Sequence, residues 1–392
     1  MQNTSPLKFR APAYYFMYFA GAAALSPFLA LYYQSRGLTG SQIGLLSAIS
    51  PLVGLVAAPL WSGFADATRR HKAISICATL GAVAAALLIG SAASLVWLIP
   101  VVIGFAFLSA PVMPLMDSST MVMLGGRRDQ YGKIRLWGTV GWAVAAPVVG
   151  WLIQRGGLEW SFYAYAALIG VALLISIPIP MGNAHVTAPF RSGVRALVTS
   201  PRWVFFLVII FFIGISATSV STYLLLYMKS LGADATLIGF SLTISTVSEV
   251  PMYFFADRIL RRFKWRGLLV IALVIYIVRL LLYTVVVSPT IMVVIQLVHG
   301  FTVPAIWAAG ISFVAESAPP GLEATSQAIF AGVLNGLAAA TGAYLGGVIY
   351  QNYGAVIMFR VFAAILFAAL LLLVFLGNRI PSTIEKPLDI LP

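Results

Sequence analysis

The chain has 392 residues, of which 61% are hydrophobic and only 9% are charged, and its formal net charge is +13. So little charge in a chain of this length excludes an ordinary soluble protein and indicates a membrane protein. The basic residues form short clusters between apolar runs, so the positive charge does not indicate a nucleic-acid-binding protein. A single cysteine, Cys77, excludes a disulfide framework and a multi-cysteine metal site.

Apolar segments fill the chain, and each is about as long as the ~20 residues that a helix needs to cross a bilayer. Polar breaks separate twelve of them: 12–33, 41–64, 73–92, 95–123, 131–154, 159–180, 203–228, 236–257, 267–288, 290–315, 324–350 and 355–377. The first has no small-residue cleavage site soon after it, so we interpret it as a retained helix and not as a signal peptide. The sequence therefore predicts an all-α integral membrane protein with twelve transmembrane helices.

The lysine and arginine residues between these segments predict the orientation of the chain. If both termini are cytoplasmic, only Arg36, Arg155 and Lys229 fall in breaks on the outside, and nearly all the others fall in cytoplasmic breaks. Membrane proteins show this bias, and one missed helix would scramble it in the second half of the chain. We therefore expect a multi-pass protein of the bacterial cytoplasmic membrane, surrounded by its lipid bilayer, with both termini in the cytoplasm.

The two halves of the chain repeat each other. In the first half QIGLLSAIS leads into PLWSGFADATRRHK, and in the second LIGFSLTIS leads into PMYFFADRILRRFK. Parallel repeats of six helices with a central site between them are typical of transporters. We predict two pseudo-symmetric six-helix bundles, 1–180 and 203–392, joined by a cytoplasmic loop at 181–202.

Two opposite charges lie inside apolar segments on either side of a short basic turn. Asp117 is in the fourth segment, ~15 Å of helical rise before Arg127, and Arg135 is near the start of the fifth. A bare charge in hydrocarbon costs at least ~2.5–3.5 kcal/mol on insertion scales, so such residues usually have a function. We expect Asp117 and Arg135 to meet in a central cavity, where a polar substrate replaces their pairing. The alternative is a purely structural ion pair.

A second group of charges is expected at similar depth in the other half. Glu249 lies about two turns before Asp257 in the eighth segment, Arg279 is in the ninth, and His299 is in the tenth. Burial favours a protonated carboxylic acid and a nearby arginine favours the carboxylate, so Glu249 can change protonation as the cavity opens to each side. We expect Glu249 to carry a proton, Arg279 to expel it, and His299 to act in coupling or substrate binding. The alternatives are an Arg–Glu clamp between helices, a hydrogen-bonding core histidine, and Asp117 as the carrier.

Two uncharged side chains complete the predicted substrate site. Trp142 lies about two turns beyond Arg135 and offers an aromatic face for a sugar, a nucleobase or a phenyl ring, although ordinary packing would explain it equally well. Asn335 is a further polar side chain in the eleventh segment. We count both among the substrate-binding residues.

An Ala-Asp pair followed by arginines closes the cytoplasmic end of the second helix in each half. The residues concerned are Asp66, Arg69 and Arg70 in the first half and Asp257, Arg258 and Arg261 in the second. A solvated topology signal explains the arginines but not the repeated aspartate. We therefore expect these residues to form salt bridges of a cytoplasmic gate, which break as the two bundles rock.

The pattern resembles the major facilitator superfamily, in particular the branch of lactose permease, the phenylpropionate permeases and the nucleoside permeases. The motifs that carry the resemblance are YGKIRLWGTVGWA at 131–143, SEVPMYFF, VRLLLY and LVHGFTVP. The RLWG sequence and the His-Gly pair are closer to those of the phenylpropionate permeases than to those of the sugar permeases. The resemblance implies that Asp117, Arg135, Trp142 and Glu249 hold the substrate, and that Arg279 and His299 couple it to a proton.

Two positions depart from lactose permease. Thr302 stands where that permease has a proton-carrying glutamate, and Gln296 stands where its tenth helix has a lysine. The protein therefore does not use that relay unchanged, and proton coupling is an expectation to be tested.

We therefore expect a secondary active transporter, a proton symporter that moves an aromatic acid, an oligosaccharide or a nucleoside by alternating access. A non-transporting sensor with the same fold is one alternative, and a lipid-modifying membrane enzyme is another. The 11 acidic residues are dispersed and form no catalytic cluster, which argues against the enzyme. The sequence contains no phosphate-binding loop for ATP, and we expect no cofactor, no metal and a monomer.

Overall fold

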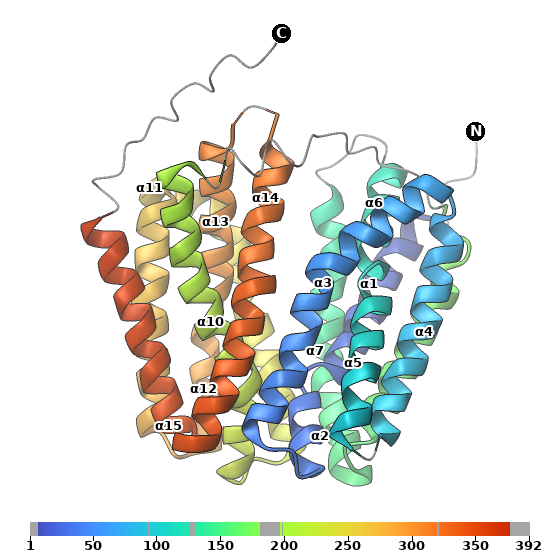
Figure 1. The fold of residues 1–392 in the computed structure, drawn as a ribbon, viewed down its shortest axis with the longest axis horizontal. Coiled ribbons are helices and arrows are strands. Elements are labelled where there is room, and N and C mark those ends of the chain that lie inside the picture. The colour runs from blue at the N-terminus through green and yellow to red at the C-terminus, as the bar shows by residue number, and fades with distance from the viewer. Residues whose placement is uncertain are drawn as a thin grey trace.

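A computed structural model of the chain describes residues 7–92, 94–124, 130–180, 197, 199–319 and 321–376, leaving aside the side chains of 7 and 8. Most of the predicted central loop at 181–202 falls outside these ranges, as do Arg127 and Arg128, and its last two residues, 201 and 202, belong to the next helix. Within them the structure is all-helical (Figure 1). Nine of the described helical spans are long and apolar enough to cross a membrane, and α8 (Trp160–Ser176) is a shorter apolar helix.

The first group of helices runs from α1 to α8; it follows the predicted segments, but the first and fourth segments are each divided into two helices. They are α1 (Leu7–Leu25), α2 (Leu29–Ser35), α3 (Gly40–Thr68), α4 (His71–Ser91), α5 (Leu95–Ser109), α6 (Val112–Leu124), α7 (Tyr131–Gly156) and α8. The second group comprises α10 (Pro201–Ser230), α11 (Ala235–Val285), α12 (Pro289–Ile295), η2 (Gln296–Phe301), α13 (Val303–Ser317), α14 (Glu323–Gly332), η3 (Val333–Leu337) and α15 (Ala338–Phe375).

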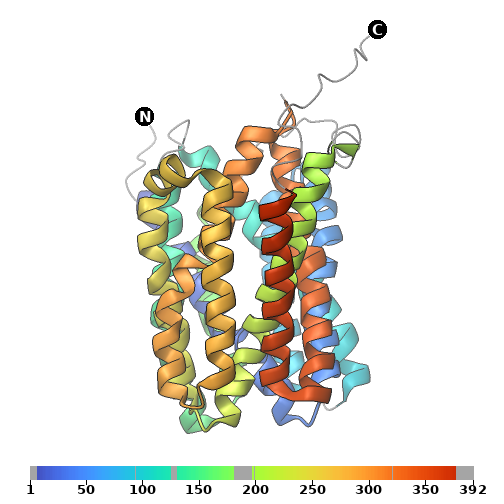
Figure 2. The same cartoon turned by 90° about the vertical axis from the view of Figure 1, so that its left-hand side faces the viewer.

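The two longest elements each contain a sharp reversal of the chain. Lys264 in α11 has φ 55° and ψ 174°, and Gly354 in α15 has φ 79° and ψ 172°, so neither residue is helical. Figure 2 shows the chain doubling back at both places, at opposite ends of the molecule. Each element is therefore a pair of antiparallel helices joined by a tight turn.

Several predicted helices are interrupted, contrary to the continuous segments that the sequence predicts. The first breaks around Pro27 and the fourth at Pro111, where the proline ring cannot continue the i to i−4 hydrogen-bond ladder. The tenth contains the 3₁₀ turn η2, followed by Thr302 at φ −107° and ψ −97°. The eleventh contains the π turn η3, a feature that often marks functional sites.

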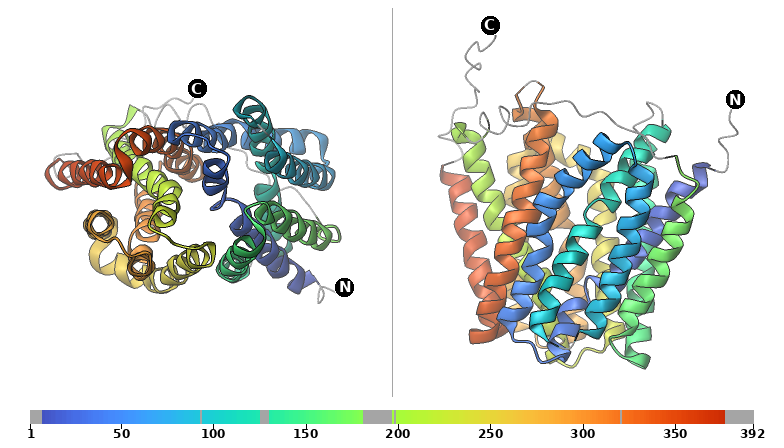
Figure 3. Two further views of the ribbon diagram at one scale, coloured as in Figure 1. Left: turned by 90° about the horizontal axis from the view of Figure 1, so that it is seen from below. Right: turned by 45° about the vertical axis from the view of Figure 1, so that its right-hand side comes forward.

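The helices form two groups that face each other across the middle of the molecule. Helices α1 to α8 lie on one side and α10 to α15 on the other (Figure 1), and the end-on view in Figure 3 shows the same division. The contacts between the groups are made chiefly by α3 with α15 and by α7 with α11. The central space therefore has walls from both halves of the chain.

Glycines bring the two groups into backbone contact at one end, which we call the closed end. A Cβ atom built on Gly40 would lie 2.7 Å from the carbonyl oxygen of Gly347, and one built on Gly239 would lie 2.7 Å from the Cα atom of Pro147. Any larger residue would force these helices apart. Within the described ranges, the hydrogen bonds that join the two groups also lie toward this end, including that of Ser41 N–H to Gln351 Oε1 at 3.0 Å.

Candidate functional site

A cavity of about 520 Å³ lies between the two groups of helices. Six of the predicted site residues line it: Arg135, Trp142, Glu249, Arg279, His299 and Asn335. They come from α7, α11, η2 and η3, so both halves of the chain contribute. Pockets of this size hold small molecules, and polar groups converging in an otherwise apolar wall are the usual sign of a binding site.

Asp117 is not one of the lining residues of this cavity, but it pairs with Arg135, which is, and its own side chain is 32% exposed. Nη1 of Arg135 lies 3.1 Å from Oδ1 and 3.3 Å from Oδ2 of Asp117. The hydroxyl of Tyr15 donates to the same Oδ1 at 2.6 Å, and the ring of Phe19 lies 5.3 Å from the guanidinium carbon. The pair is partly open to the cavity, since the Arg135 side chain is 40% exposed. A ligand can therefore reach Arg135 without first breaking its ion pair with Asp117.

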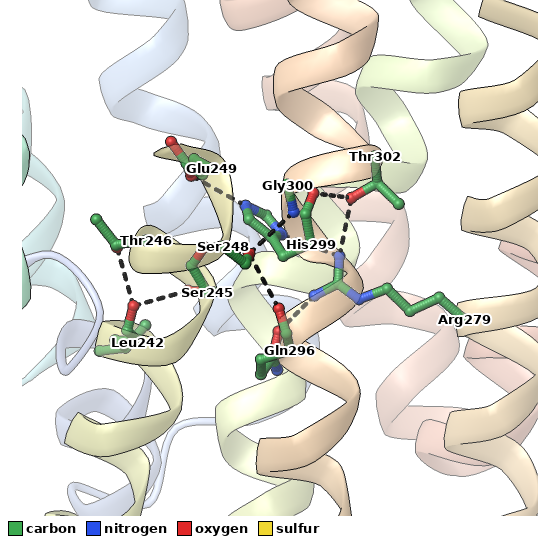
Figure 4. A network of polar contacts seen from close by, with 10 residues as sticks. All are labelled: Leu242, Ser245, Thr246, Ser248, Glu249, Arg279, Gln296, His299, Gly300 and Thr302. Atoms are coloured by element: carbon green, nitrogen blue, oxygen red, sulfur yellow. Dashed lines mark hydrogen bonds and ion pairs between the residues drawn. The ribbon is translucent and has the colours of Figure 1, made fainter. Parts of the chain in front are cut away.

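Arg279 is the most deeply buried charge of the site, with 3% of its surface exposed. Nε donates to the Tyr283 hydroxyl at 2.8 Å, Nη2 to Oε1 of Gln296 at 2.5 Å, and Nη1 to Oγ1 of Thr302 at 3.2 Å. These partners are uncharged, and Figure 4 shows that Gln296, Thr302 and His299 surround the end of the guanidinium. Gln296 and Thr302, the two residues that depart from lactose permease, thus both accept hydrogen bonds from this arginine.

His299 connects the buried guanidinium to the carboxylate of Glu249. Its Nδ1 lies 2.9 Å from Nη1 of Arg279, and its Nε2 lies 3.3 Å from Oε1 of Glu249 (Figure 4). An arginine can only donate, so Nδ1 must accept, and the proton of the neutral ring then sits on Nε2 and points to Glu249. The tautomer is assigned from this network. The result is one chain from cation to anion through a neutral imidazole.

A tight contact between α11 and η2 sets the position of this chain. Oγ of Ser248 accepts from the N–H of Gly300 at 3.0 Å and lies 3.2 Å from the carbonyl oxygen of Gln296. A Cβ atom on Gly300 would collide with the backbone of Ser248 and would lie 3.0 Å from the nitrogen of Glu249. Only glycine therefore allows the break in the tenth segment to bring His299 against Glu249.

Trp142 and Asn335 supply uncharged walls to the cavity. Asn335 belongs to the π turn η3 and is exposed to the central space. Neither side chain has a hydrogen-bond partner among the residues that the structure describes. Both polar groups are therefore available to a ligand.

The predicted gate residues lie at the end opposite the closed end. Asp66 pairs with His71, with Oδ1 and Nε2 3.0 Å apart, and not with Arg69 or Arg70. In the described part of the chain Asp257 forms no ion pair. The gate at Asp66, Arg69, Arg70, Asp257, Arg258 and Arg261 stays a prediction about another state of the protein.

Sequence reasoning missed several polar residues of the site. Tyr15 holds Asp117, Tyr283 holds Arg279, and Ser248 positions the η2 turn. A signal was present for the tyrosines, because each lies in an apolar segment that also contains or faces a charge. Nothing in the sequence pattern distinguishes Ser248 from the other small polar residues of its helix.

Comparison with known proteins agrees with this architecture. The model of the MFS_1 like family matches residues 9–361. A maltose permease of Geobacillus stearothermophilus is 29% identical over 94% of both chains, and a probable 3-phenylpropionic acid transporter of Escherichia coli is 25% identical over 87% of this chain and 90% of its own. The maltose permease is thus the more similar of the two over the whole chain, although the RLWG and His-Gly motifs are closer to those of the phenylpropionate permeases.

The crystal structure of the nucleoside transporter NupG has the same fold. It superposes with a TM-score of 0.84 at 17% identity, covering 95% of this chain and 99% of its own. A likeness at this identity supports the fold alone. Because the family model covers most of the sequence, the chain belongs to the MFS_1 like family and is a transporter of the major facilitator superfamily, not an enzyme.

Proposed function

We propose that the protein is a proton symporter, a secondary active transporter that moves a small polar or aromatic solute through the membrane by alternating access. The observation that carries this proposal is the chain from Arg279 through His299 to Glu249, which lines the same cavity as Arg135 and Trp142. A proton-binding carboxylate and a solute-binding cation that share one chamber can respond to each other.

We propose twelve membrane crossings with both termini in the cytoplasm, arranged as bundles 1–180 and 203–392 around the central site. Nine long apolar spans, one reversal inside each of α11 and α15, and the shorter α8 together account for this number. With this orientation the closed end faces the outside, and the cavity is reached from the cytoplasm. The salt bridges at Asp66 and Asp257 would then form when the cytoplasmic side closes.

The solute binds, in this proposal, between the Arg135–Asp117 pair and Trp142. A hydroxyl-bearing solute accepts from the guanidinium and donates to the carboxylate, while its ring lies on the indole. An anionic solute would use Arg135 alone, with Asp117 protonated. The similar proteins are named for maltose, 3-phenylpropionic acid and nucleosides, all small molecules of the kind that a cavity of about 520 Å³ can hold.

Glu249 is the proton carrier in this proposal, and Arg279 expels the proton. When Glu249 is protonated, its attraction to the Arg279–His299 chain falls, and α11 is freer to shift against η2. When the cavity opens to the cytoplasm, the buried positive charge favours loss of the proton, and the carboxylate again accepts from Nε2 of His299. Proton and solute therefore cross together, and the protein acts as a monomer without cofactor or metal.

Purified protein in liposomes is expected to accumulate its solute only under an inward proton gradient. Maltose, 3-phenylpropionate and uridine are the probes, each radiolabelled, with and without a protonophore. We expect at least one of them to accumulate about tenfold or more above equilibrium, and the protonophore to remove that accumulation. Accumulation that the protonophore leaves unchanged would contradict proton coupling.

A further inference from the structure

A second cavity adjoins the central one at Trp142. Its volume is about 390 Å³, and Ser221, Leu225 and Leu242 also line both cavities. None of its described lining residues is charged. We call it the outer chamber.

The outer chamber lies between the central cavity and the closed end. Tyr33 belongs to α2, and Ser47 lies about two turns along α3 from Gly40, whose backbone meets Gly347 at the closed end. Trp142 lines both cavities, so its indole ring lies where they adjoin. The chamber therefore extends the central cavity toward the closed end.

Four hydroxyl groups of the outer chamber have no hydrogen-bond partner in the part of the chain that the structure describes. They belong to Tyr33, Ser47, Ser50 and Thr222. Helical serines elsewhere bond back to their own helix, as Ser219 does to the carbonyl of Ile215 at 2.8 Å. Tyr33 is only 2% exposed, yet its hydroxyl is not among the wholly enclosed, unpartnered atoms. These hydroxyls therefore remain reachable from the chamber.

Unpaired hydroxyls in a chamber with mostly apolar walls favour a ligand that can complete their hydrogen bonds. A phenyl ring cannot do so, and a charged group would meet no opposite charge there. A hexose ring carries several hydroxyls, each of which both donates and accepts. The indole N–H of Trp142 also lacks a described acceptor and borders both cavities.

We propose that the outer chamber is a second subsite, which binds the uncharged, hydroxyl-bearing ring of a neutral disaccharide whose other ring lies in the central cavity. This rests on the proposed transport function and names its substrate class. Trp142 is the wall between the two rings, so one indole serves both subsites. Aromatic acids fit this arrangement poorly, because they would leave the hydroxyls of the chamber unpaired.

The proposal is tested by binding to the purified full-length protein in detergent, using calorimetry and thermal shift. The probes are maltose, lactose and sucrose, their methyl-monosaccharide counterparts, uridine and 3-phenylpropionate. We expect a disaccharide to bind about tenfold or more tightly than its monosaccharide. The double variant Tyr33→Phe and Thr222→Val should weaken that disaccharide about tenfold, since each neutral hydrogen bond is worth roughly 2- to 12-fold in affinity. It should change monosaccharide affinity less than about twofold, within the scatter expected of distant substitutions.

Tyr227→Phe is the matched control, because Tyr227 is also buried in a helix but lines neither cavity. It is expected to leave disaccharide affinity unchanged. Binding of uridine or 3-phenylpropionate with no binding of any disaccharide would overturn the proposal. So would disaccharide affinity that is the same in the double variant and in the control.

This assay contains no membrane and no gradient, so it is independent of coupling. Disaccharide binding that depends on Tyr33 and Thr222, without gradient-driven uptake, would support the subsite and refute the symporter. Gradient-driven uptake of a solute whose affinity is the same in the double variant as in the wild type would support the symporter and refute the subsite.

Discussion

Glu249→Gln is expected to abolish gradient-driven accumulation, so that solute inside the liposomes rises only to equilibrium, while exchange of solute across the membrane continues. Glutamine has nearly the same shape and still accepts the hydrogen bond from His299 Nε2, which lies 3.3 Å from the carboxylate in the wild type. It carries no titratable proton, so it resembles the protonated acid permanently. The solute site at Arg135 and Trp142 is untouched, so binding and exchange should persist.

The measurement for this variant compares uptake under an inward proton gradient with exchange against preloaded solute. Glu316→Gln is the control, because Glu316 is an exposed carboxylate that pairs with Arg202 away from the cavity. We expect the control to behave as the wild type in both assays. Normal accumulation by Glu249→Gln would mean that another group, such as Asp117, carries the proton.

Gly239→Trp is expected to prevent the closed end from forming and so to stop transport almost completely. Gly239 lies against the backbone of Ala146 and Pro147, and even a Cβ atom would stand 2.7 Å from the Cα atom of Pro147. Backbone cannot rotate away as a side chain can, so an indole there must separate α11 from α7. The protein should then remain open toward the outside, with its solute site still able to bind.

Cysteine labelling from the closed end measures this opening. The natural cysteine, Cys77, is exposed, so it is first replaced with serine, and a new cysteine is placed at Ser47. We expect a membrane-impermeant maleimide to label Ser47→Cys about tenfold faster when Gly239→Trp is also present than when Gly239 is retained. Gly104→Trp is the matched control, because nothing lies within 4 Å of a Cβ atom at Gly104. Equal labelling rates with Gly239→Trp and with the Gly104→Trp control, or normal transport by Gly239→Trp, would disprove the role of the glycine contact.

The helices and the gathering of buried charges in one cavity could be predicted, because both follow from the free-energy cost of placing polar groups in lipid. A bilayer demands about 20 apolar residues per crossing, so the segments show in hydropathy alone. Charges at 135, 249 and 279 are costly in lipid, and the structure brings all three to one cavity. Asp66 lies at the end of α3 as the repeated Ala-Asp motif predicts, but Asp257 lies about two turns before the reversal at Lys264, so the eighth helix is longer than predicted.

The partners within the site could not be predicted, because they depend on how each helix is rotated and where it breaks. Pro304 follows the irregular Thr302, yet nothing in the sequence shows that η2 turns Gln296 and Thr302 toward Arg279. Asp117 pairs with Arg135 and Tyr15 beside the cavity and is not one of its lining residues. Such contacts are set by tertiary packing and not by local pattern.

The position of Thr302 and Gln296 also changes how the departure from lactose permease is understood. Both residues bond the buried guanidinium of Arg279, so they keep it solvated by neutral groups. The only carboxylate joined to this arginine in the described chain is Glu249, through His299. In the proposed symport mechanism, the coupling proton is therefore carried by this one acid.

Proton movement during solute uptake tests the central claim most directly, which is that Glu249 carries a proton across with each solute. Liposomes containing the protein are placed in weakly buffered medium, and the external pH is recorded when solute is added. The wild type is expected to make the medium alkaline as solute enters, and Glu249→Gln is expected to give no pH change. Solute entry without alkalinisation in the wild type, or an equal signal from the variant, would contradict the account.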